Sequence, residues 1–163
     1  MKTLIVIRHS HAAGREGGET DFDRHLTSKG KDETVRVALR LKADGHIPDL
    51  IVTSAATRAF ETAEIIEAIL APGKGLVTTN RGLYYATPQK LEDAIYCLPD
   101  DRNSVLMISH NPGVSELARN LSNGRVWFME NTQTLILDYD IEKWNDIPLK
   151  NPVKVNYFKP SDI

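Results

Sequence analysis

Short apolar runs alternate with helical patterns along most of this chain. The runs at 2–7, 50–52 and 105–108 are each followed by a turn and then by apolar residues at helical spacing, and a weaker strand at 76–78 precedes a helical stretch near 88–98. Uninterrupted apolar runs of this length are typical of strands that are buried on both faces. Their alternation with helices predicts a parallel sheet with helices on both sides.

The helices can be delimited from their apolar spacing and their stop signals. From about 28 to 42, apolar residues recur at helical spacing until Gly45 and Pro48 end the pattern: Val35, Ala38, Leu39 and Leu41. A second helix is expected from 57 to 70, where Pro72 and Gly73 follow, and a third after Pro112, ending near Gly124. The first of these helices is amphipathic, as expected for a helix that covers a sheet.

The pattern changes after Gly124. The segments 134–139 and 153–158 are predicted to be late strands at a sheet edge, and three large aromatic residues are predicted to pack within this part of the chain: Trp127, Phe128 and Trp144. The fold class is therefore α/β, with one three-layer α/β/α domain and a mostly parallel central sheet.

The length of 163 residues corresponds to one domain, and we assign 1–163 to it. Hydrophobic residues make up 41% and the net charge is −2, which is typical of a soluble globular protein. The 20 Lys and Arg residues are scattered among 22 Asp and Glu residues, so a nucleic-acid partner is not expected.

The amino-terminal apolar run is too short to direct the chain to a membrane. It ends at Arg8 after five residues, whereas a signal peptide needs about 7–15 apolar residues and a membrane span needs about 20. The one cysteine, Cys97, excludes an internal disulfide and a cysteine-based zinc site. We therefore expect a cytoplasmic protein without a membrane anchor.

Basic and hydroxyl side chains follow three of the predicted strands, at the point where each strand ends. The first strand leads into Arg8-His9-Ser10-His11, the second into 53–58 with Arg58, and the run at 105–108 into Ser109-His110. Ligand sites of such sheets lie at the carboxyl ends of the strands, so these groups are expected to converge. Because guanidinium groups match phosphate oxygens in pairs, the sequence predicts an anion pocket with a candidate histidine nucleophile.

The histidine in this predicted pocket is suited to act as a nucleophile. A neutral imidazole is a competent nucleophile near pH 7 without a separate base. The sequence offers no competing cluster of carboxylates for Mg²⁺, since Glu19, Asp21 and Asp23 share one loop. No metal and no cofactor are expected.

These signatures, together with Thr62, resemble the histidine phosphatase superfamily over almost the whole chain. The segment 23–27 with Gly30, the turn 109–112 and the short length are similar to the small SixA-type phosphohistidine phosphatases. The resemblance implies a phosphoglycerate-mutase-like fold and a covalent phosphohistidine on His9. It also implies four groups that hold the phosphate oxygens: Arg8, Arg58, His110 and Arg24.

The chain departs from the family pattern at several positions. Ser10 stands where many members have Gly, and we expect its backbone N–H still to face the phosphate. His25 stands where many SixA-like chains have Pro, and we leave its role open, including that of a gate, along with His11 as a pocket residue. Tyr84 and Tyr85 are assigned either to packing or to substrate contact. No general acid is identified, because Asn111 follows His110 and 81–85 contains no carboxylate.

The sequence thus predicts a metal-independent phosphatase that hydrolyses phosphohistidine, in a protein or as a phosphoramidate. Its partner would be a phosphohistidine-containing signalling or phosphotransfer protein. The alternatives are a small-molecule phosphomonoesterase, a mutase-like enzyme, or a phosphate-binding module without catalysis. His9 favours an enzyme over the binding module, because anion binding alone does not use an unprotonated imidazole.

Overall fold

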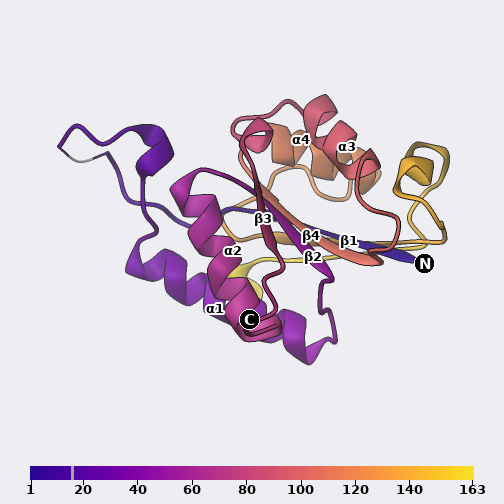
Figure 1. Cartoon of the computed structure of the whole chain (residues 1–163), viewed down its shortest axis with the longest axis horizontal. Coiled ribbons are helices and arrows are strands. Elements are labelled where there is room, and N and C mark those ends of the chain that lie inside the picture. The colour runs from indigo at the N-terminus through magenta and orange to yellow at the C-terminus, as the bar shows by residue number, and fades with distance from the viewer. Residues whose placement is uncertain (16) are drawn as a thin grey trace.

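A six-stranded mixed sheet forms the centre of the structure, a computed structural model that describes residues 1–15 and 17–163 (Figure 1). The strand order is β3-β2-β4-β1-β5-β6. The strands are β1 (Lys2–Arg8), β2 (Leu50–Ser54), β3 (Val77–Asn80), β4 (Ser104–Ser109), β5 (Thr134–Tyr139) and β6 (Lys154–Phe158). The first four are mutually parallel, and β5 and β6 complete one edge in antiparallel pairing. The predicted, mostly parallel sheet is confirmed.

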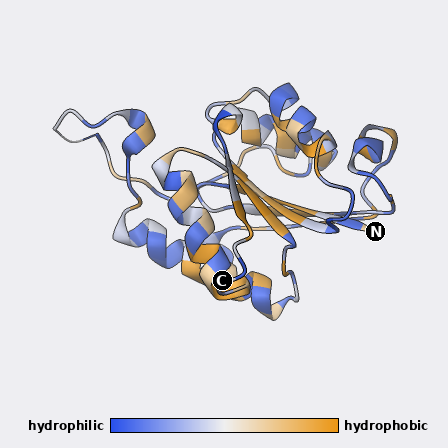
Figure 2. Ribbon diagram, viewed as in Figure 1, coloured by the Kyte–Doolittle hydropathy of each residue, from blue (hydrophilic) through white to orange (hydrophobic). Residues whose placement is uncertain are grey.

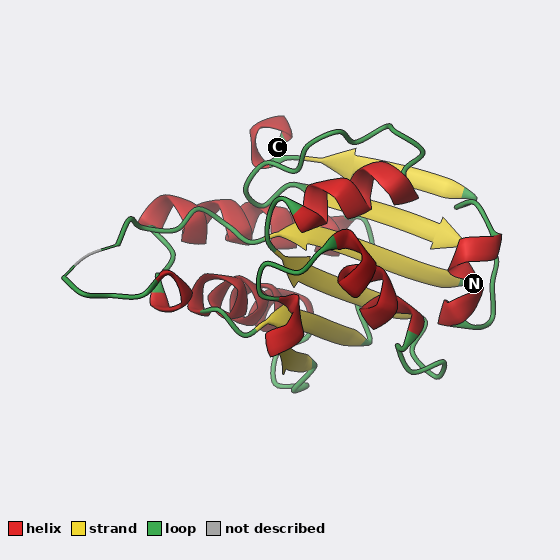
Figure 3. Ribbon diagram, turned by 90° about the horizontal axis from the view of Figure 1, so that it is seen from above, coloured by secondary structure: helices red, strands yellow, loops and turns green. Residues whose placement is uncertain are grey.

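Two pairs of helices cover the two faces of the sheet. Figure 1 shows α1 (Ser28–Ala43) and α2 (Thr57–Leu70) below it, and α3 (Pro88–Tyr96) and α4 (Gly113–Leu121) above it. From above, α3 and α4 lie across the strands (Figure 3). Within the described residues, three short 3₁₀ helices lie in the connections, η1 (Asp21–Asp23), η2 (Arg81–Leu83) and η3 (Trp144–Leu149), and a fourth, η4 (Pro160–Asp162), follows β6. Among residues 1–15 and 17–163, no helix is long and apolar enough to cross a membrane.

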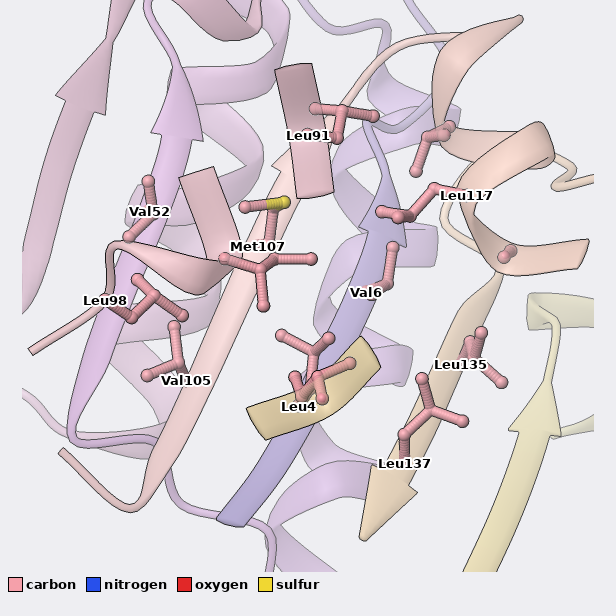
Figure 4. Packing of buried hydrophobic residues seen from close by; sticks show 14 of the residues in the cluster. Leu4, Val6, Val52, Leu91, Leu98, Val105, Met107, Leu117, Leu135 and Leu137 are labelled. Carbon is pink, nitrogen blue, oxygen red and sulfur yellow. The ribbon is translucent and has the colours of Figure 1, made fainter. Parts of the chain in front are cut away.

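The apolar run of β1 is continuous because both of its faces are covered. Leu4 and Val6 belong to the core beneath α3 and α4, whereas Ile5 and Ile7 belong to the core against α1 and α2. Figure 4 shows Leu4 and Val6 among the leucines of the first core, and Figure 2 shows the central strands as the most hydrophobic part of the ribbon. The two cores hold the carboxyl end of β1 fixed between two layers of helices.

Four of the apolar residues singled out in the sequence are exposed, and for two of them, Trp127 and Phe128, the prediction that they pack was wrong. On α1, Val35 and Leu39 are exposed, and the buried face consists of Gly30, Thr34, Val37, Ala38 and Leu41. This helix packs on one side only, so residues one position away from the buried stripe turn to solvent. Trp127 and Phe128 are also exposed, because the buried neighbours on either side of them, Val126 and Met129, occupy the core. Trp144 is fully buried, as predicted.

Two glycines permit close contacts that position the functional region. A Cβ at Gly30 would collide with the backbone oxygen of His11, just after β1, and a Cβ at Gly113 would collide with the backbone oxygen of Ala86. The amino-terminal ends of α1 and α4 therefore lie in direct contact with the backbone of neighbouring loops. Thr27 caps α1 by accepting a hydrogen bond from the N–H of Gly30 at 3.0 Å.

Candidate active site

The structure brings His9, His110 and Arg58 together at the carboxyl ends of the parallel strands. Arg8 on β1 pairs in register with Ser109 on β4, so His9 and His110 leave neighbouring strands side by side. Their ring centroids are 4.9 Å apart. Arg58 lies in the first turn of α2, directly after β2, and its side chain reaches both rings. The parallel topology thus gathers the three groups that the sequence placed at strand ends.

His9 presents an unprotonated nitrogen to Arg58. Its Nδ1 lies 2.8 Å from the backbone oxygen of Ser10, and since a carbonyl oxygen only accepts, Nδ1 carries the proton. The lone pair is therefore on Nε2, which accepts a hydrogen bond from Nε of Arg58 at 3.3 Å. Burial lowers the pKa of His9 far below its usual value, and the nearby guanidinium charges lower it further against the opposing hydrogen bond to Ser10. His9 is neutral at physiological pH.

His110 is also held neutral. Its Nδ1 lies 3.3 Å from Nη2 of Arg58, which only donates, so Nδ1 is the acceptor and Nε2 donates to Oγ of Ser54 at 2.7 Å. Burial lowers the pKa of His110 strongly, and the adjacent His9 and Arg58 add to that effect. The two imidazoles thus have opposite tautomers. The backbone oxygen of Ser10 fixes the tautomer of His9, and the hydroxyl of Ser54 fixes that of His110.

Arg8 and Arg24 add two further guanidinium groups. Nη1 of Arg8 donates to the backbone oxygen of Met129 at 3.1 Å, while its Nε is buried and has no hydrogen-bond acceptor among the residues that the structure describes. Nε of Arg24 donates to the backbone oxygen of Ala13 at 2.6 Å. A buried guanidinium nitrogen without an acceptor is suited to an oxygen of a bound oxyanion.

A small polar pocket of about 260 Å³ lies beside His9. Its lining consists of Arg8, His9, His11, Ala12, Arg24, Arg58, Tyr85, Asn111 and Asn131. His110 lies behind this lining, with its side chain almost fully buried. Three arginines around a neutral histidine form an environment that matches a phosphate group. Within the described part of the chain, no group of three or more His, Cys, Asp or Glu side chains is arranged to hold a metal ion.

Asp21 is a site residue whose contacts the sequence did not reveal. Its backbone oxygen accepts from Nη1 of Arg58 at 2.6 Å, and its carboxylate accepts from Nη2 of Arg58 at 3.1 Å and from Arg24 at 3.0 Å. Tyr84 donates to the same carboxylate at 2.6 Å. Burial raises the pKa of Asp21, but these hydrogen bonds and the charge of Arg58 outweigh it and keep the pKa well below the usual range. Asp21 is an ionised bridge between two arginines.

Asn131 is a second residue that sequence reasoning missed. Its Nδ2 donates to the backbone oxygen of His9 at 3.1 Å, and it lines the pocket. Because β5 runs antiparallel to β1, the residues before β5 lie next to the residues that leave β1. The signal that could have found Asn131 is therefore the antiparallel pairing of the late strand β5 with β1.

The residues whose roles were left open occupy different places. His11 lines the pocket, and its Nδ1 lies 2.8 Å from Oγ1 of Thr27. His25 lies outside the pocket lining, where its exposed ring contacts Glu61 of α2 at 2.6 Å. Tyr84 contacts Asp21, and Tyr85 lines the pocket with its ring 5.8 Å from the guanidinium of Arg58.

The expectation that the backbone N–H of Ser10 faces the phosphate was wrong. This N–H donates to Oγ1 of Thr62 at 3.2 Å, and Ser10 is fully buried. The hydroxyl of Ser10 donates to the backbone oxygen of Gly30 at 2.8 Å. Ser10 therefore connects the end of β1 to both helices: its N–H bonds to α2 and its hydroxyl bonds to α1.

Two relatives match most of this chain. One is an uncharacterized chloroplastic protein of Arabidopsis thaliana, 29% identical over 137 residues that cover 77% of this chain. This chain spans only 61% of the length of that protein. The other is an uncharacterized protein of Picosynechococcus, 34% identical over 128 residues that cover 75% of this chain and 74% of the relative.

Solved structures match the fold over nearly the full length. The protein histidine phosphatase SixA, complexed with tungstate, superposes with a TM-score of 0.81 at 22% identity and 98% coverage of both chains. A phosphoserine phosphatase of Entamoeba histolytica gives a TM-score of 0.66 at 17% identity, covering 98% of this chain and 99% of the other. The predicted phosphoglycerate-mutase-like, three-layer fold is confirmed.

A family model identifies the part of the chain that carries most of the site. The model of the histidine phosphatase superfamily (branch 1) matches residues 4–81, which include Arg8, His9, Asp21, Arg24 and Arg58. His110 and Asn131 lie beyond this match and reach the site through β4 and the segment before β5. On this match and on the 34% identity to the Picosynechococcus relative, of which this chain covers 74%, the chain belongs to the histidine phosphatase superfamily.

Proposed function

We propose that this chain is a phosphohistidine phosphatase that works through a covalent phosphohistidine on His9 and uses no metal ion. Membership of the histidine phosphatase superfamily supports phosphatase activity. The observation that carries the finer proposal is the geometry of two groups: Nε2 of His9 accepts a hydrogen bond from Arg58, and the carboxylate of Asp21 accepts from Arg58, Arg24 and Tyr84, contacts that favour its ionised form.

The first step transfers the phosphoryl group to the enzyme. The lone pair on Nε2 of His9 forms a bond to phosphorus while the bond from phosphorus to the substrate nitrogen breaks. The other nitrogen of the substrate ring takes up a proton from solvent before that bond breaks, so the electron pair of the bond stays on a neutral imidazole that leaves. The hydrogen bond from Nδ1 of His9 to Ser10 persists and stabilises the positive charge of the phosphorylated ring. Arg8, Arg24 and Arg58 stabilise the phosphoryl oxygens.

The second step returns the free enzyme. Water attacks phosphorus, the bond to Nε2 of His9 breaks, and its electron pair returns to the ring. The protons of the attacking water are divided between the released phosphate and solvent. Neither step requires an oxidant, a metal ion or a protonated carboxylate. The likeness in fold to a SixA structure that holds tungstate, a tetrahedral oxyanion, supports the assignment of an oxyanion pocket.

The ionised state of Asp21 supports phosphohistidine over alkyl phosphates. An alkoxide leaving group resembles hydroxide, whose conjugate acid has a pKa of about 15.7, and it departs slowly without a proton donor. An imidazole leaving group has a conjugate acid with a pKa of about 6.5, so it departs at neutral pH with a proton from solvent. General acid catalysis contributes about 10²–10⁴-fold, and an enzyme without an acid loses that factor on alkyl phosphates but little of it on phosphoramidates.

One set of assays tests this proposal. Release of phosphate is measured from phosphohistidine, phosphoramidate, an aryl phosphate and an alkyl phosphate, with and without EDTA, in wild type and His9→Ala. We expect activity in that order of substrates, no loss in EDTA, and acid-labile phosphate on His9 in rapid-quench samples. Equal kcat/KM on the alkyl phosphate would favour a small-molecule phosphomonoesterase or mutase-like enzyme. The absence of any turnover would favour a phosphate-binding module, and full activity of His9→Ala would exclude His9 as nucleophile.

A further inference from the structure

We propose that Trp127, Phe128 and Tyr157 form a docking surface for a folded protein that carries the phosphohistidine. We call these three residues the aromatic patch. The proposal rests on the proposed function and deepens it, because it names the substrate as a protein and assigns the surface that recognises it.

The aromatic patch is exposed and lies next to the catalytic pocket. The three side chains are 71%, 58% and 51% exposed in the order Trp127, Phe128 and Tyr157. All three line one surface depression of about 510 Å³. Phe128 also lines a second depression of about 340 Å³, together with Arg8, His11 and Asn131, and those three residues line the catalytic pocket as well. The patch is therefore continuous with the place where the phosphate binds.

The backbone holds Trp127 and Phe128 outward. Val126 and Met129, on either side, are buried in the core, and their N–H groups donate to Oγ of Ser122 at 3.0 Å and Oγ of Ser115 at 2.8 Å. The backbone oxygen of Met129 accepts hydrogen bonds from Arg8 at 3.1 Å and from Asn111 at 3.0 Å. The same residue thus fixes both the patch and two lining residues of the pocket.

Arginine side chains lie against both exposed rings. The guanidinium of Arg119 is 5.3 Å from the ring of Trp127, and that of Arg8 is 5.8 Å from the ring of Phe128. These contacts restrict the rings in the free protein. Aromatic side chains that are already positioned lose little conformational entropy on binding, which is why Trp and Tyr dominate the binding energy of many protein interfaces.

The pocket itself has little with which to select a leaving group. Its lining is polar except for Ala12 and Tyr85, so it recognises phosphate and not the group that carries it. Trp127 does not line this pocket, so a small phosphoramidate that binds there has no need to contact it. A folded protein whose phosphohistidine enters the pocket must cover the surface beyond Phe128, because that surface adjoins the pocket.

The charges around the aromatic patch favour an apolar partner surface. Of the four charged side chains that line the 510 Å³ depression, Lys159 pairs with Glu130 at 2.7 Å, and Arg125 and Asp162 carry opposite charges. Such pairs leave little net charge to attract a partner, while the arginines of the pocket attract the phosphate. The partner that fits is a domain with an exposed apolar surface beside its phosphohistidine.

The test compares a protein substrate with a small one. The probes are a phosphotransfer domain phosphorylated on its histidine and free phosphoramidate, and the variants are Trp127→Ala and Tyr157→Ala. Leu149→Ala is the matched control, since Leu149 is 79% exposed and lies beside Met1, at the other end of β1 from His9. Phe128 is left unchanged because its ring contacts Arg8.

We expect both patch variants to lose at least about tenfold in kcat/KM on the phosphorylated domain, the effect of truncating a binding hot spot. On phosphoramidate they stay within twofold of wild type, as Leu149→Ala does on both probes. Equal losses on the two probes, or no loss on the domain, would overturn the docking surface. A wild type that hydrolyses phosphoramidate but not the domain would also overturn it and leave the proposed function standing. Inactivity on both probes would instead contradict the proposed function.

Discussion

Nε of Arg58 lies 3.3 Å from Nε2 of His9, the nitrogen that carries the lone pair. This contact couples a permanent positive charge to the nucleophile in a buried setting. The guanidinium disfavours protonation of the imidazole, so the lone pair is retained, and the same guanidinium is placed to stabilise the oxygens of a phosphoryl group as it approaches. Arg58 therefore has two roles: it keeps His9 unprotonated, and it binds the phosphoryl group that His9 attacks.

The first prediction concerns Arg58. Arg58→Ala is expected to lower kcat/KM on phosphoramidate by about 10²–10³-fold, the usual effect of deleting a group that stabilises transition-state charge. Arg58→Lys should recover little, because an ammonium cannot replace planar contacts to His9, His110 and Asp21 at once. Arg40→Ala serves as the control, since Arg40 pairs with Asp44 on the exposed face of α1. Activity within threefold of wild type in Arg58→Ala would place the anion site elsewhere.

The placement of His9, His110 and Arg58 could be predicted because it depends on topology. Parallel strands bring their carboxyl ends to one edge, so any residue directly after such a strand is located once the strands are recognised. The same pattern predicted helices α1 and α2 to within a residue or two. Continuous apolar runs make this signal strong, since only a sheet covered on both sides can bury them.

Asp21 and Trp127 could not be placed in the same way. Asp21 acts through the path of a loop that folds back on Arg58, and loop paths leave no periodic signal in the sequence. Trp127 lies between buried neighbours, so its hydrophobicity suggests packing while its backbone directs it to solvent. In both cases the role of the residue depends on its own contacts in the folded protein, and the hydrophobic pattern of the surrounding sequence does not predict those contacts.

A second prediction concerns Gly113, at the start of α4. In Gly113→Ala the new Cβ would meet the backbone oxygen of Ala86, and because both partners are backbone atoms, one segment must move. We expect a loss of about 1–3 kcal/mol in the free energy of unfolding, as for other overpacked positions. Activity should fall as well, since the displaced segments carry Tyr85 and His110.

Urea unfolding and phosphoramidate assays check this prediction. Gly14→Ala is the matched control, because nothing lies within 4 Å of a Cβ at Gly14. That variant should change the stability by no more than about 0.5 kcal/mol. A fully stable Gly113→Ala would show that α4 can shift without cost.

A third prediction separates a positioning role of Asp21 from a role as general acid. Asp21→Asn keeps the size of the side chain but removes the charge that bridges Arg58 and Arg24. We expect kcat/KM to fall on phosphoramidate, aryl phosphate and alkyl phosphate by similar factors, because loosened arginines affect every phosphoryl group alike. A general acid would behave differently, since its removal lowers activity by about 10²–10⁴-fold on alkyl phosphates and spares phosphoramidate. A selective loss of that kind would contradict the ionised state of Asp21.

The last prediction concerns stability at low pH. The folded protein depresses the pKa of His9 and His110, whereas both histidines have a pKa of about 6.5 in the unfolded chain. As the pH falls below about 6.5, the unfolded chain takes up protons that the folded protein refuses, so the free energy of unfolding decreases until the folded pKa values are reached. Each histidine contributes a slope of up to about 1.4 kcal/mol per pH unit.

His110→Asn isolates one of these contributions. Relative to wild type, its free energy of unfolding should decline less steeply between pH 6.5 and 5, by up to about 1.4 kcal/mol per pH unit, in urea titrations at several pH values. His25→Asn is the control with the opposite sign. A hydrogen bond to Glu61 raises the pKa of His25, so its stabilising contribution is present at low pH and is lost as the pH rises through the folded pKa. Parallel pH profiles for wild type and His110→Asn would mean that His110 takes up its proton in the folded protein as readily as in the unfolded chain.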